Sequence, residues 1–237
     1  MDDKSRIQIK KGSAKFIRGF TTPEEINNWW IENADTIGIG FVGRSNVGKS
    51  SLINTMFGGK TARTSKTPGR TQAINVFTYE LTKDNTYFKY YLYDLPGYGH
   101  ASVAKSMSKS WMALMDAFFT ALNQKTLLLN IQDARHPHQA ADQGFYNYIN
   151  PKLIDIFLVV NKIDKLKKQK ERAALNKLKP QIYSDYKHVK QIFFVSAQKK
   201  TGVEQLEQAV INFNLNLKNN QGDTSGLDEI IESESKD

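Results

Sequence analysis

Six apolar, β-branched runs recur along this chain, and helical patterns separate most of them. The runs occupy residues 36–43, 73–81, 87–95, 126–133, 154–162 and 192–197. Several are almost continuously apolar, which is typical of strands buried on both faces of a sheet. Helical patterns follow them at residues 50–57, 106–123, 140–149, 167–183 and 203–218. This alternation predicts an α/β fold in which helices cover both faces of a mostly parallel sheet.

Two further segments refine this prediction. The second and third runs are joined by the short polar segment 81–87, which favours an antiparallel hairpin and therefore a mixed sheet. Near the start, residues 14–20 read as a short strand. Thr22 before Pro23, with Glu25 three residues after Thr22, is typical of a helix start. We expect this short N-terminal strand and helix to precede the main sheet, with Trp29 and Trp30 as packing residues.

Charge is unevenly distributed. The net charge is +9, but residues 221–237 hold six acids and one lysine, which leaves 32 basic and 18 acidic residues in the rest of the chain. A positively charged region of this kind attracts polyanions, although many lysines can also serve solubility alone. We expect a basic extension at residues 1–14, one domain at 15–219 and an acidic, disordered tail at 220–237.

The composition narrows the location and the chemistry. The chain has no cysteine, which excludes disulfides and thiolate metal sites and fits a cytoplasmic protein. No apolar run is long enough to span a bilayer, and the N-terminus has no apolar segment of the signal-peptide kind. We therefore expect no membrane association.

A glycine-rich segment lies between the first strand run and the first main helix. Gly43 to Ser50 reads G-x-x-x-x-G-K-S, the pattern of a phosphate-binding loop. Gly43 and Gly48 allow successive N–H groups to point inward, and the helix N-terminus adds partial positive charge. Lys49 would reach the β- and γ-phosphates and Ser50 would bind Mg²⁺. The nucleotide-binding candidates here are Gly43, Arg44, Ser45, Asn46, Val47, Gly48, Lys49, Ser50 and Ser51. The alternative is a glycine-rich turn without a ligand.

A second motif indicates which base is bound. Asn161, Lys162 and Asp164 form N-K-x-D at the end of the fifth run. The Asp164 carboxylate can accept hydrogen bonds from guanine N1–H and the N2 amino group, a donor pair that adenine lacks. Lys162 can pack along the base and the phosphate loop, and Asn161 can hold the segment to its neighbours. Alone, the motif could be a solvated turn. Backbone amides at Ser196, Ala197 and Gln198 could meet guanine O6.

Two further segments are candidates for sensing the γ-phosphate. Asp94 would hold Mg²⁺ through water, and the Gly97 N–H would contact the γ-phosphate. The segment 58–71 contains four basic residues and no acid. Its Thr71 is the preferred second Mg²⁺ hydroxyl, with Thr67 as the alternative. Gly69, Arg70 and Thr71 are expected in the nucleotide site, on a loop that orders around γ-phosphate and metal.

Taken together, these segments resemble a known family. The segments GRSNVGKSSLIN, SKTPGRTQAINVF, YDLPGYGHA, NKIDKL and VSAQKKTG, with DARHP at 133–137 and Asp142 soon after it, resemble the EngB/YihA/YsxC family of bacterial ribosome-assembly GTPases over residues 15–215. The resemblance implies a Ras-like P-loop GTPase fold with an extra N-terminal strand and helix. It also implies GTP/GDP as ligand, Mg²⁺ as cofactor and the large ribosomal subunit, or its precursor, as partner. His100 and Gln198 depart from the residues common at these positions, and the acidic tail is not part of the family pattern.

The expected reaction is attack of water on the γ-phosphate of GTP, with Lys49, Thr71 and Gly97 as the catalytic groups. Tyr98 stands where a water-positioning glutamine is usual, so we expect slow intrinsic turnover. Asn46 occupies the place of an asparagine in related potassium-activated GTPases, and it could hold K⁺ beside the phosphates or only stabilise the loop. His100 and the ribosome itself are other conceivable helpers.

The segment 165–179 holds seven basic residues and one acid. As a helix it would turn Leu166, Ala173, Ala174 and Leu178 partly inward and most lysines outward. Either it contacts ribosomal RNA phosphates or it is an ordinary solvated helix face. We expect RNA backbone contacts, no DNA and a monomer. The alternatives are a GTP-regulated binding or signalling module without meaningful turnover, and a P-loop ATPase or kinase, against which the N-K-x-D motif argues.

Overall fold

The computed structural model describes residues 6–59, 61–62, 73–84, 86–98, 105–122, 125–152 and 154–219. Several predicted residues lie outside these ranges: Thr67, Gly69, Arg70, Thr71, His100 and the acidic segment 220–237.

The fold is built on one mixed sheet with the strand order β1-β4-β5-β3-β6-β7-β8, in which β2 also pairs with β4. The strands are β1 (Gln8–Ile9), β2 (Lys15–Phe20), β3 (Gly38–Gly43), β4 (Ile74–Lys83), β5 (Thr86–Asp94), β6 (Thr126–Asp133), β7 (Ile156–Asn161) and β8 (Val189–Phe194). β4 and β5 form the predicted antiparallel hairpin, whereas β5, β3, β6, β7 and β8 run parallel. The prediction of a mixed, mostly parallel sheet is confirmed.

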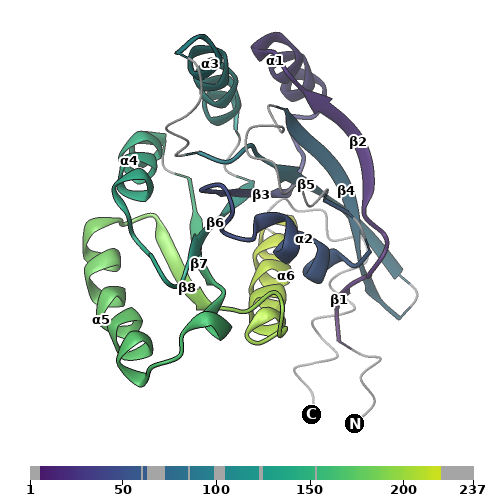
Figure 1. Ribbon diagram of the computed structural model, residues 1–237. Helices are drawn as coiled ribbons and strands as arrows, with labels where there is room; N and C mark the ends of the chain where they lie inside the picture. Colours follow the sequence, from purple (N-terminus) through teal and green to yellow (C-terminus); the bar gives the residue numbers. More distant parts are fainter. Residues whose placement is uncertain are drawn as a thin grey trace.

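Helices cover both faces of this sheet, as predicted (Figure 1). The helices are α1 (Pro23–Glu32), α2 (Lys49–Phe57), α3 (Lys105–Ala121), α4 (Ala140–Ile149), α5 (Gln169–Asp185) and α6 (Val203–Asn219), with short 3-10 helices η2 (Asn150–Lys152) and η3 (Ile163–Lys165). Side chains of α1, α3, α4 and α5 pack on one face, and those of α2 and α6 on the other. Each face thus has its own hydrophobic core. No helix in the described ranges has the length and apolar character needed to cross a bilayer.

The N-terminal strand is part of the main sheet. β2 pairs antiparallel with β4, and so does the two-residue β1, which lies within the predicted basic extension. The capping box is confirmed: the Glu25 N–H donates to Thr22 Oγ1 at 3.3 Å, and the Thr22 N–H donates to Glu25 Oε2 at 3.0 Å. Such caps stabilise a helix by about 1 kcal/mol. Trp29 and Trp30 are buried against the sheet, as expected of packing residues.

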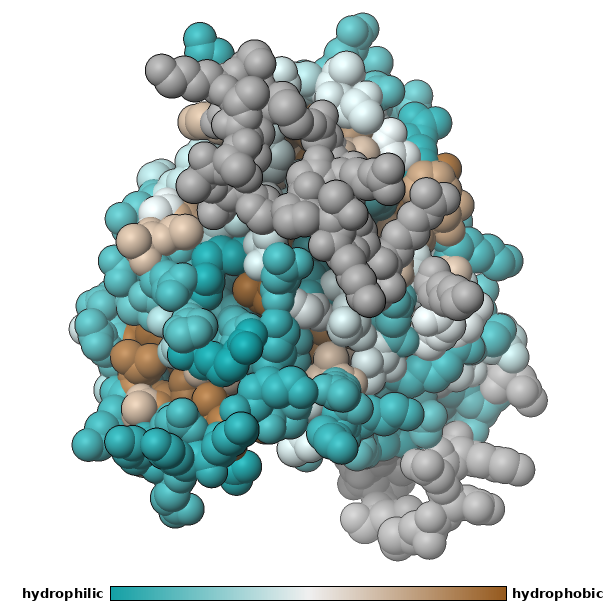
Figure 2. Space-filling model, viewed as in Figure 1, coloured by the Kyte–Doolittle hydropathy of each residue, from teal (hydrophilic) through white to brown (hydrophobic). Residues whose placement is uncertain are grey.

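Two details of the sequence prediction are wrong. The last strand ends at Phe194, before Ser196, because the Ser196 N–H donates to the Thr201 carbonyl and closes a turn instead of continuing the strand. In α5, Ala173 and Ala174 are exposed, and the inward side carries Leu175, Leu178 and Ile182. Leu175, Leu178 and Ile182 are spaced i, i+3 and i+7 and set the inward stripe of the helix, which leaves Ala173 and Ala174 outside it. The face shown in Figure 2 is mainly hydrophilic, with a small apolar gathering near α5.

The topology positions the candidate site. β3, β5, β6 and β7 are parallel neighbours, so their carboxyl ends, with Gly43, Asp94, Asp133 and Asn161, meet at one edge of the sheet. Ligands of open α/β sheets bind at this edge. The segments singled out in the sequence therefore come together.

Candidate nucleotide-binding site

The phosphate-binding loop connects β3 to α2, and its two glycines are structurally required. A side chain at Gly43 would collide with the Ile131 carbonyl oxygen of the neighbouring strand β6. Gly48 has φ of 95°, and a side chain there would collide with the Asn161 amide. Helix α2 begins at the next residue, so its first N–H groups have no partner within the helix and face the loop. The loop therefore has the geometry of an anion-binding site.

The lysine of the loop is already paired with β5. The Lys49 ammonium contacts the Asp94 carboxylate, and both side chains are largely buried. Asp94 is the last residue of β5 and Lys49 the first of α2, so two rigid elements fix this pair. Ser50, the next residue of α2, is half-buried. One cation, one carboxylate and one hydroxyl thus lie at the start of the helix.

The segment after Asp94 is attached to the loop by backbone contacts. The Tyr98 N–H donates to the Gly43 carbonyl at 3.2 Å, and the Ser45 N–H donates to the Tyr98 carbonyl at 3.4 Å. A side chain at Gly97 would approach Ser45 Oγ to 2.9 Å, closer than a real Cβ tolerates. Gly97 is therefore packed directly on the loop, as its predicted role requires.

Asn161 connects three separate parts of the chain. Its buried Nδ2 donates to the Val47 carbonyl at 3.1 Å, and its Oδ1 accepts from the Ala197 N–H at 3.0 Å. Lys162 has a left-handed φ of 67°, and its ammonium contacts the Asn46 carbonyl and Asp133 Oδ2, the latter at 2.9 Å. Both residues hold the N-K-x-D segment against the phosphate-binding loop, as the sequence analysis proposed.

Asp164 is held as a carboxylate. Ser196 Oγ donates to Asp164 Oδ1 at 2.6 Å, and Lys165 lies 3.1 Å from Oδ2. The Ser196 hydrogen bond is the main cause that lowers the pKa of Asp164 below its ordinary value. The Gln198 side chain instead accepts from Lys165 at 3.0 Å, so a ligand contact at this position would fall to its backbone. Asp164 is thus an acceptor at neutral pH.

A buried network links the loop to α4, and the sequence analysis did not identify it. Arg44 Nε lies 3.1 Å from both carboxylate oxygens of Asp142, and its other nitrogens donate to Gln139 at 2.5 Å and to the His136 carbonyl at 2.6 Å. The Tyr98 hydroxyl donates to Asp142 Oδ1 at 2.9 Å. The Gln139 N–H also donates to Asp142 Oδ2 at 2.9 Å. Asp142 is fully buried, so these three donors satisfy a charge that would otherwise be costly. The sequence signal was Asp142 itself, which follows DARHP in the family resemblance, but the sequence did not show its partners.

Tyr98 is consequently removed from the site. Its ring is 7% exposed and stacks on Phe145 with centroids 4.8 Å apart, and its hydroxyl also accepts from Asn130 at 3.0 Å. Burial, followed by the charge of Asp142, raises the pKa of Tyr98. A hydroxyl committed to Asp142 and Asn130 is not available to orient water at a phosphate. The described part of the chain therefore offers no substitute for a catalytic glutamine at this position.

Asp133, at the end of β6, is another charged residue of the site, and the sequence did not indicate its role. Burial alone would raise the pKa of Asp133, but hydrogen bonds from Arg135 and Lys162 outweigh burial and hold the pKa well below its ordinary value. Arg135 Nη2 lies 2.6 Å from Asp133 Oδ2. Asp133 thus fixes the Lys162 side chain. It lies at the end of β6, the strand between β3 and β7 at this edge of the sheet.

Among the described residues, four predicted segments converge: 43–51, 94–97, 161–164 and 196–198. The basic segment with Thr67 and Thr71 lies outside them, so the second Mg²⁺ hydroxyl stays a prediction. No group of three His, Asp or Glu side chains in the described ranges could hold a metal by itself. Mg²⁺ in nucleotide sites is usually bound by one or two protein ligands together with substrate phosphates.

Comparison with known proteins identifies the family. A model of the family described as "50S ribosome-binding GTPase" matches residues 38–162. A probable GTP-binding protein EngB of Laribacter hongkongensis is 36% identical over 205 residues, which are 86% of this chain and 88% of the relative. Another of Fusobacterium nucleatum is 37% identical over 201 residues, 84% of this chain and 95% of the relative.

Solved structures support the Ras-like GTPase fold. Era of Aquifex aeolicus, in a crystal structure bound to GDP and aluminium fluoride, has a TM-score of 0.60 at 24% identity, over 74% of this chain and 56% of that chain. This chain therefore spans little more than half the length of that protein. A crystal structure of a probable GTP-binding protein engB has a TM-score of 0.52 at 21% identity, over 76% of this chain and 99% of that chain.

The charge of Asp133 should stabilise the fold in a pH-dependent way. Because its pKa is lowered in the folded state, the stability it contributes is present above the unfolded-state pKa and is lost as the pH falls below it. We expect Asp133→Asn to cost about 1–3 kcal/mol at pH 7. The difference in the free energy of unfolding between wild type and this variant should become smaller as the pH falls below about 4, near the ordinary pKa of aspartate.

Urea unfolding between pH 7 and pH 3 measures this gap. The matched control is Asp155→Asn, because Asp155 is a half-exposed carboxylate paired with Lys190 at 3.3 Å and should change stability little at any pH. A gap for Asp133→Asn that stays constant with pH would show that its effect is not electrostatic.

Proposed function

The chain belongs to the EngB family of GTP-binding proteins, and from this premise we propose that it hydrolyses GTP as a switch in assembly of the large ribosomal subunit. The hydrogen bonds of Asn161 are the main support for nucleotide binding. They hold the phosphate-binding loop and the turn after β8 together beside Asp164. The family description names the 50S ribosome, which supports the assembly role.

Guanine recognition would rest on Asp164. Its lowered pKa keeps it charged, and Ser196 takes up part of its acceptor capacity while orienting it. A carboxylate in this position suits the adjacent N1–H and N2 donors of guanine, and adenine would leave it unpaired. Lys162, held by Asp133, would lie against the base, and backbone N–H groups of 196–198 would face O6.

The triphosphate and Mg²⁺ would be bound at the start of α2. Loop N–H groups of residues 43–51 and the Lys49 ammonium would neutralise the phosphates, so Lys49 would exchange its contact with Asp94 for phosphate oxygens. Ser50 and, through water, Asp94 would bind Mg²⁺, which supplies charge stabilisation at the β- and γ-phosphates. Thr71, or Thr67 in its place, would add the second hydroxyl.

Hydrolysis would depend mainly on placement and electrostatics, with Lys49, the Gly97 N–H and Thr71 around the γ-phosphate. Because the Tyr98 hydroxyl is bonded to Asp142, the chain alone would turn over slowly. The same observation keeps a second candidate function open, a GTP-regulated binding module without meaningful turnover. Stimulation of hydrolysis by large-subunit particles would distinguish the switch from that module.

The partner surface is expected to be basic. In α5 and the turn before it, Lys167, Lys168, Lys170, Arg172 and Lys177 are all exposed. Such a surface favours RNA phosphates. We therefore propose ribosomal RNA within the large subunit or its precursor as the partner of a monomeric protein, acting in the cytoplasm, with no role for DNA or a membrane.

A monovalent cation is a candidate for the missing catalytic group. Asn46 has a left-handed φ of 64° and an exposed side chain at the loop, so its amide oxygen is free to meet a K⁺ ion beside the phosphates. We predict faster GTP turnover in KCl than in NaCl at equal ionic strength, and loss of this difference in Asn46→Ala. Equal rates in the two salts would leave Asn46 with a structural role only.

We predict that Asp164→Asn weakens GDP binding at least about a hundredfold, because each hydrogen bond to a charged group contributes about 1.5–3 kcal/mol. Xanthosine diphosphate should gain affinity, since its ring offers an acceptor where guanine has the N2 donor. Calorimetry with both nucleotides measures this exchange. Asp185→Asn, an exposed position at the end of α5, is the matched control and should bind GDP like wild type. Unchanged GDP affinity in Asp164→Asn would remove Asp164 as the base reader.

The assembly role is tested by capture from cell extract. Protein loaded with a non-hydrolysable GTP analogue should retain large-subunit RNA and proteins better than protein loaded with GDP. The association should weaken steeply between about 50 and 200 mM salt, because phosphate contacts release counterions. Equal capture in the two nucleotide states, or capture that is insensitive to salt, would contradict a nucleotide-controlled RNA contact.

A further inference from the structure

One part of the sheet is left open by the helices. Trp29 of α1 packs edge-on against Tyr91 of β5, with ring centroids 5.7 Å apart, so α1 covers the sheet at this point. Side chains alternate along a strand, so Tyr87, Lys89 and Tyr91 share this face. Tyr87 is 51% exposed and Lys89 is exposed, so the face beyond α1 is open to solvent.

Aromatic rings and basic side chains are interleaved on this open face. Lys10 lies over the Tyr87 ring at 3.9 Å from its centroid, and Lys89 lies 5.8 Å from the Tyr91 ring. At the margin with α1, the Arg18 guanidinium of β2 lies 5.8 Å from the Trp29 ring. Cation–π contacts occur about once per 70–80 residues in proteins, so three on one sheet face are a local concentration.

The central part of the face is net positive. Its cations are Lys10, Lys15, Arg18 and Lys89, and its central acid is Glu80, which binds Lys10 at 2.9 Å. Lys15, Arg18 and Lys89 make no ion pair with the described residues. At its borders lie the exposed acids Glu32, Asp35 and Asp84, of which Asp35 is bound to Lys125 at 2.8 Å. The central part, with four cations and one acid, therefore complements a polyanion, and the acids at the borders limit this surface to the centre of the face.

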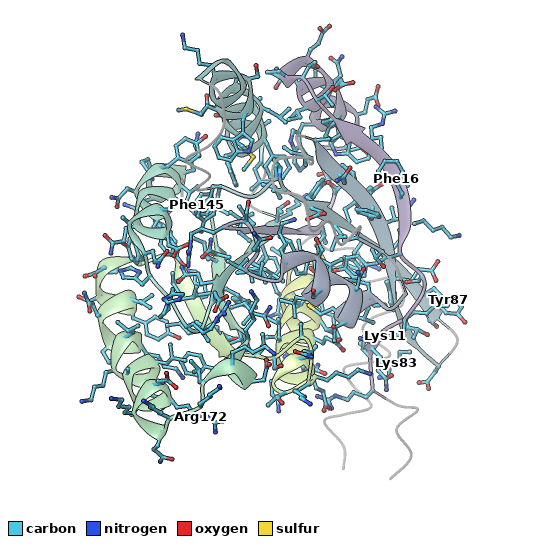
Figure 3. All side chains as sticks on the ribbon, viewed as in Figure 1. Lys11, Phe16, Lys83, Tyr87, Phe145 and Arg172 are labelled. Carbon is cyan, nitrogen blue, oxygen red and sulfur yellow. The ribbon has the colours of Figure 1, made fainter. Side chains whose placement is uncertain are left out.

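A structural role does not account for the aromatic residues at this position. A packing residue would be buried, as Tyr90 and Tyr93 are on the same strand, whereas half of Tyr87 faces solvent. Phe16 of β2, by contrast, pairs with Phe77 on the other face of the sheet and is not part of this surface. Figure 3 places Tyr87 on the side of the molecule opposite Phe145 and Arg172.

We propose that this open face of β2, β4 and β5, with Lys10, Lys15, Arg18, Lys89, Tyr87 and Tyr91, binds single-stranded RNA. Bases stack on the tyrosine rings, and phosphates lie against the basic side chains. Single strands are required because a paired helix does not present base faces to a flat surface. The proposal rests on the proposed function, since it names RNA as the partner, and it replaces the sequence-based expectation of backbone contacts alone.

The face is remote from the nucleotide site. Tyr87 and Asp94 are seven residues apart on one strand, which corresponds to about 23 Å at 3.3 Å per residue. Substitutions of Tyr87 and Lys89 should therefore leave GDP affinity unchanged. This allows RNA binding and nucleotide binding to be scored separately in the same variants.

The test is a fluorescence anisotropy titration of the full chain with GDP and Mg²⁺ against a labelled twelve-nucleotide oligouridylate. We expect Tyr87→Ala to weaken binding at least fivefold and Tyr87→Phe to stay within about twofold of wild type, because stacking needs the ring and not the hydroxyl. The matched control is Tyr148→Ala. Tyr148 is also a partly exposed tyrosine near a lysine, with Lys152 5.4 Å from its ring, but it lies on α4. This variant should bind like wild type.

A second measurement addresses the charges. Lys15→Gln and Lys89→Gln should each lower the slope of log affinity against log salt by about 0.7–1, the effect of one lost phosphate contact. The proposal is overturned if the wild type does not bind the oligouridylate at about 100 μM protein, or if Tyr87→Ala and wild type bind it equally. It is also overturned if a blunt RNA duplex binds as tightly as the single strand. Failure of GDP binding by the wild type would instead refute the proposed function, with the RNA result still readable.

Discussion

One buried amide determines the geometry of the candidate site. Asn161 donates to Val47 and accepts from Ala197, and Gly48 has no side chain because this amide occupies the space. A misplaced amide would leave two backbone groups unsatisfied in the core, which costs about 1–3 kcal/mol each. The phosphate-binding loop and the base-reading turn are thus held in one fixed relation before any ligand binds, and such preorganisation lowers the entropic cost of binding.

Much of this arrangement could be predicted from the sequence because the chemistry is local. Gly43, Gly48 and Lys49 show their role through spacing, and Asp94 and Asn161 are the final residues of recognisable strand runs. Parallel strands then bring these ends to one edge without further information. Thr22 and Glu25 were predictable for the same reason, since a capping box is formed by residues three apart.

The rest depends on contacts between residues far apart in the chain. Asp142 lies 98 positions from Arg44 and 44 from Tyr98, and no local pattern shows that one carboxylate binds both. Tyr98 illustrates the consequence: its position in the sequence indicates a missing glutamine, but only packing against Phe145 shows where the hydroxyl goes. The interleaved face of β5 was hidden for a related reason, because Lys10 and Tyr87 meet only when β1 joins the sheet.

β5 pairs with β4 along its whole length and with β3 over residues 91–94. Asp94 is its last residue and Tyr87 lies near its beginning. The number of residues between them therefore determines which face of the sheet each side chain occupies. A single inserted or deleted residue between them would reverse the alternation and turn Tyr87 and Lys89 toward α2 and α6. During evolution, insertions and deletions should therefore occur in the hairpin turn between Lys83 and Thr86, while the length of β5 stays constant.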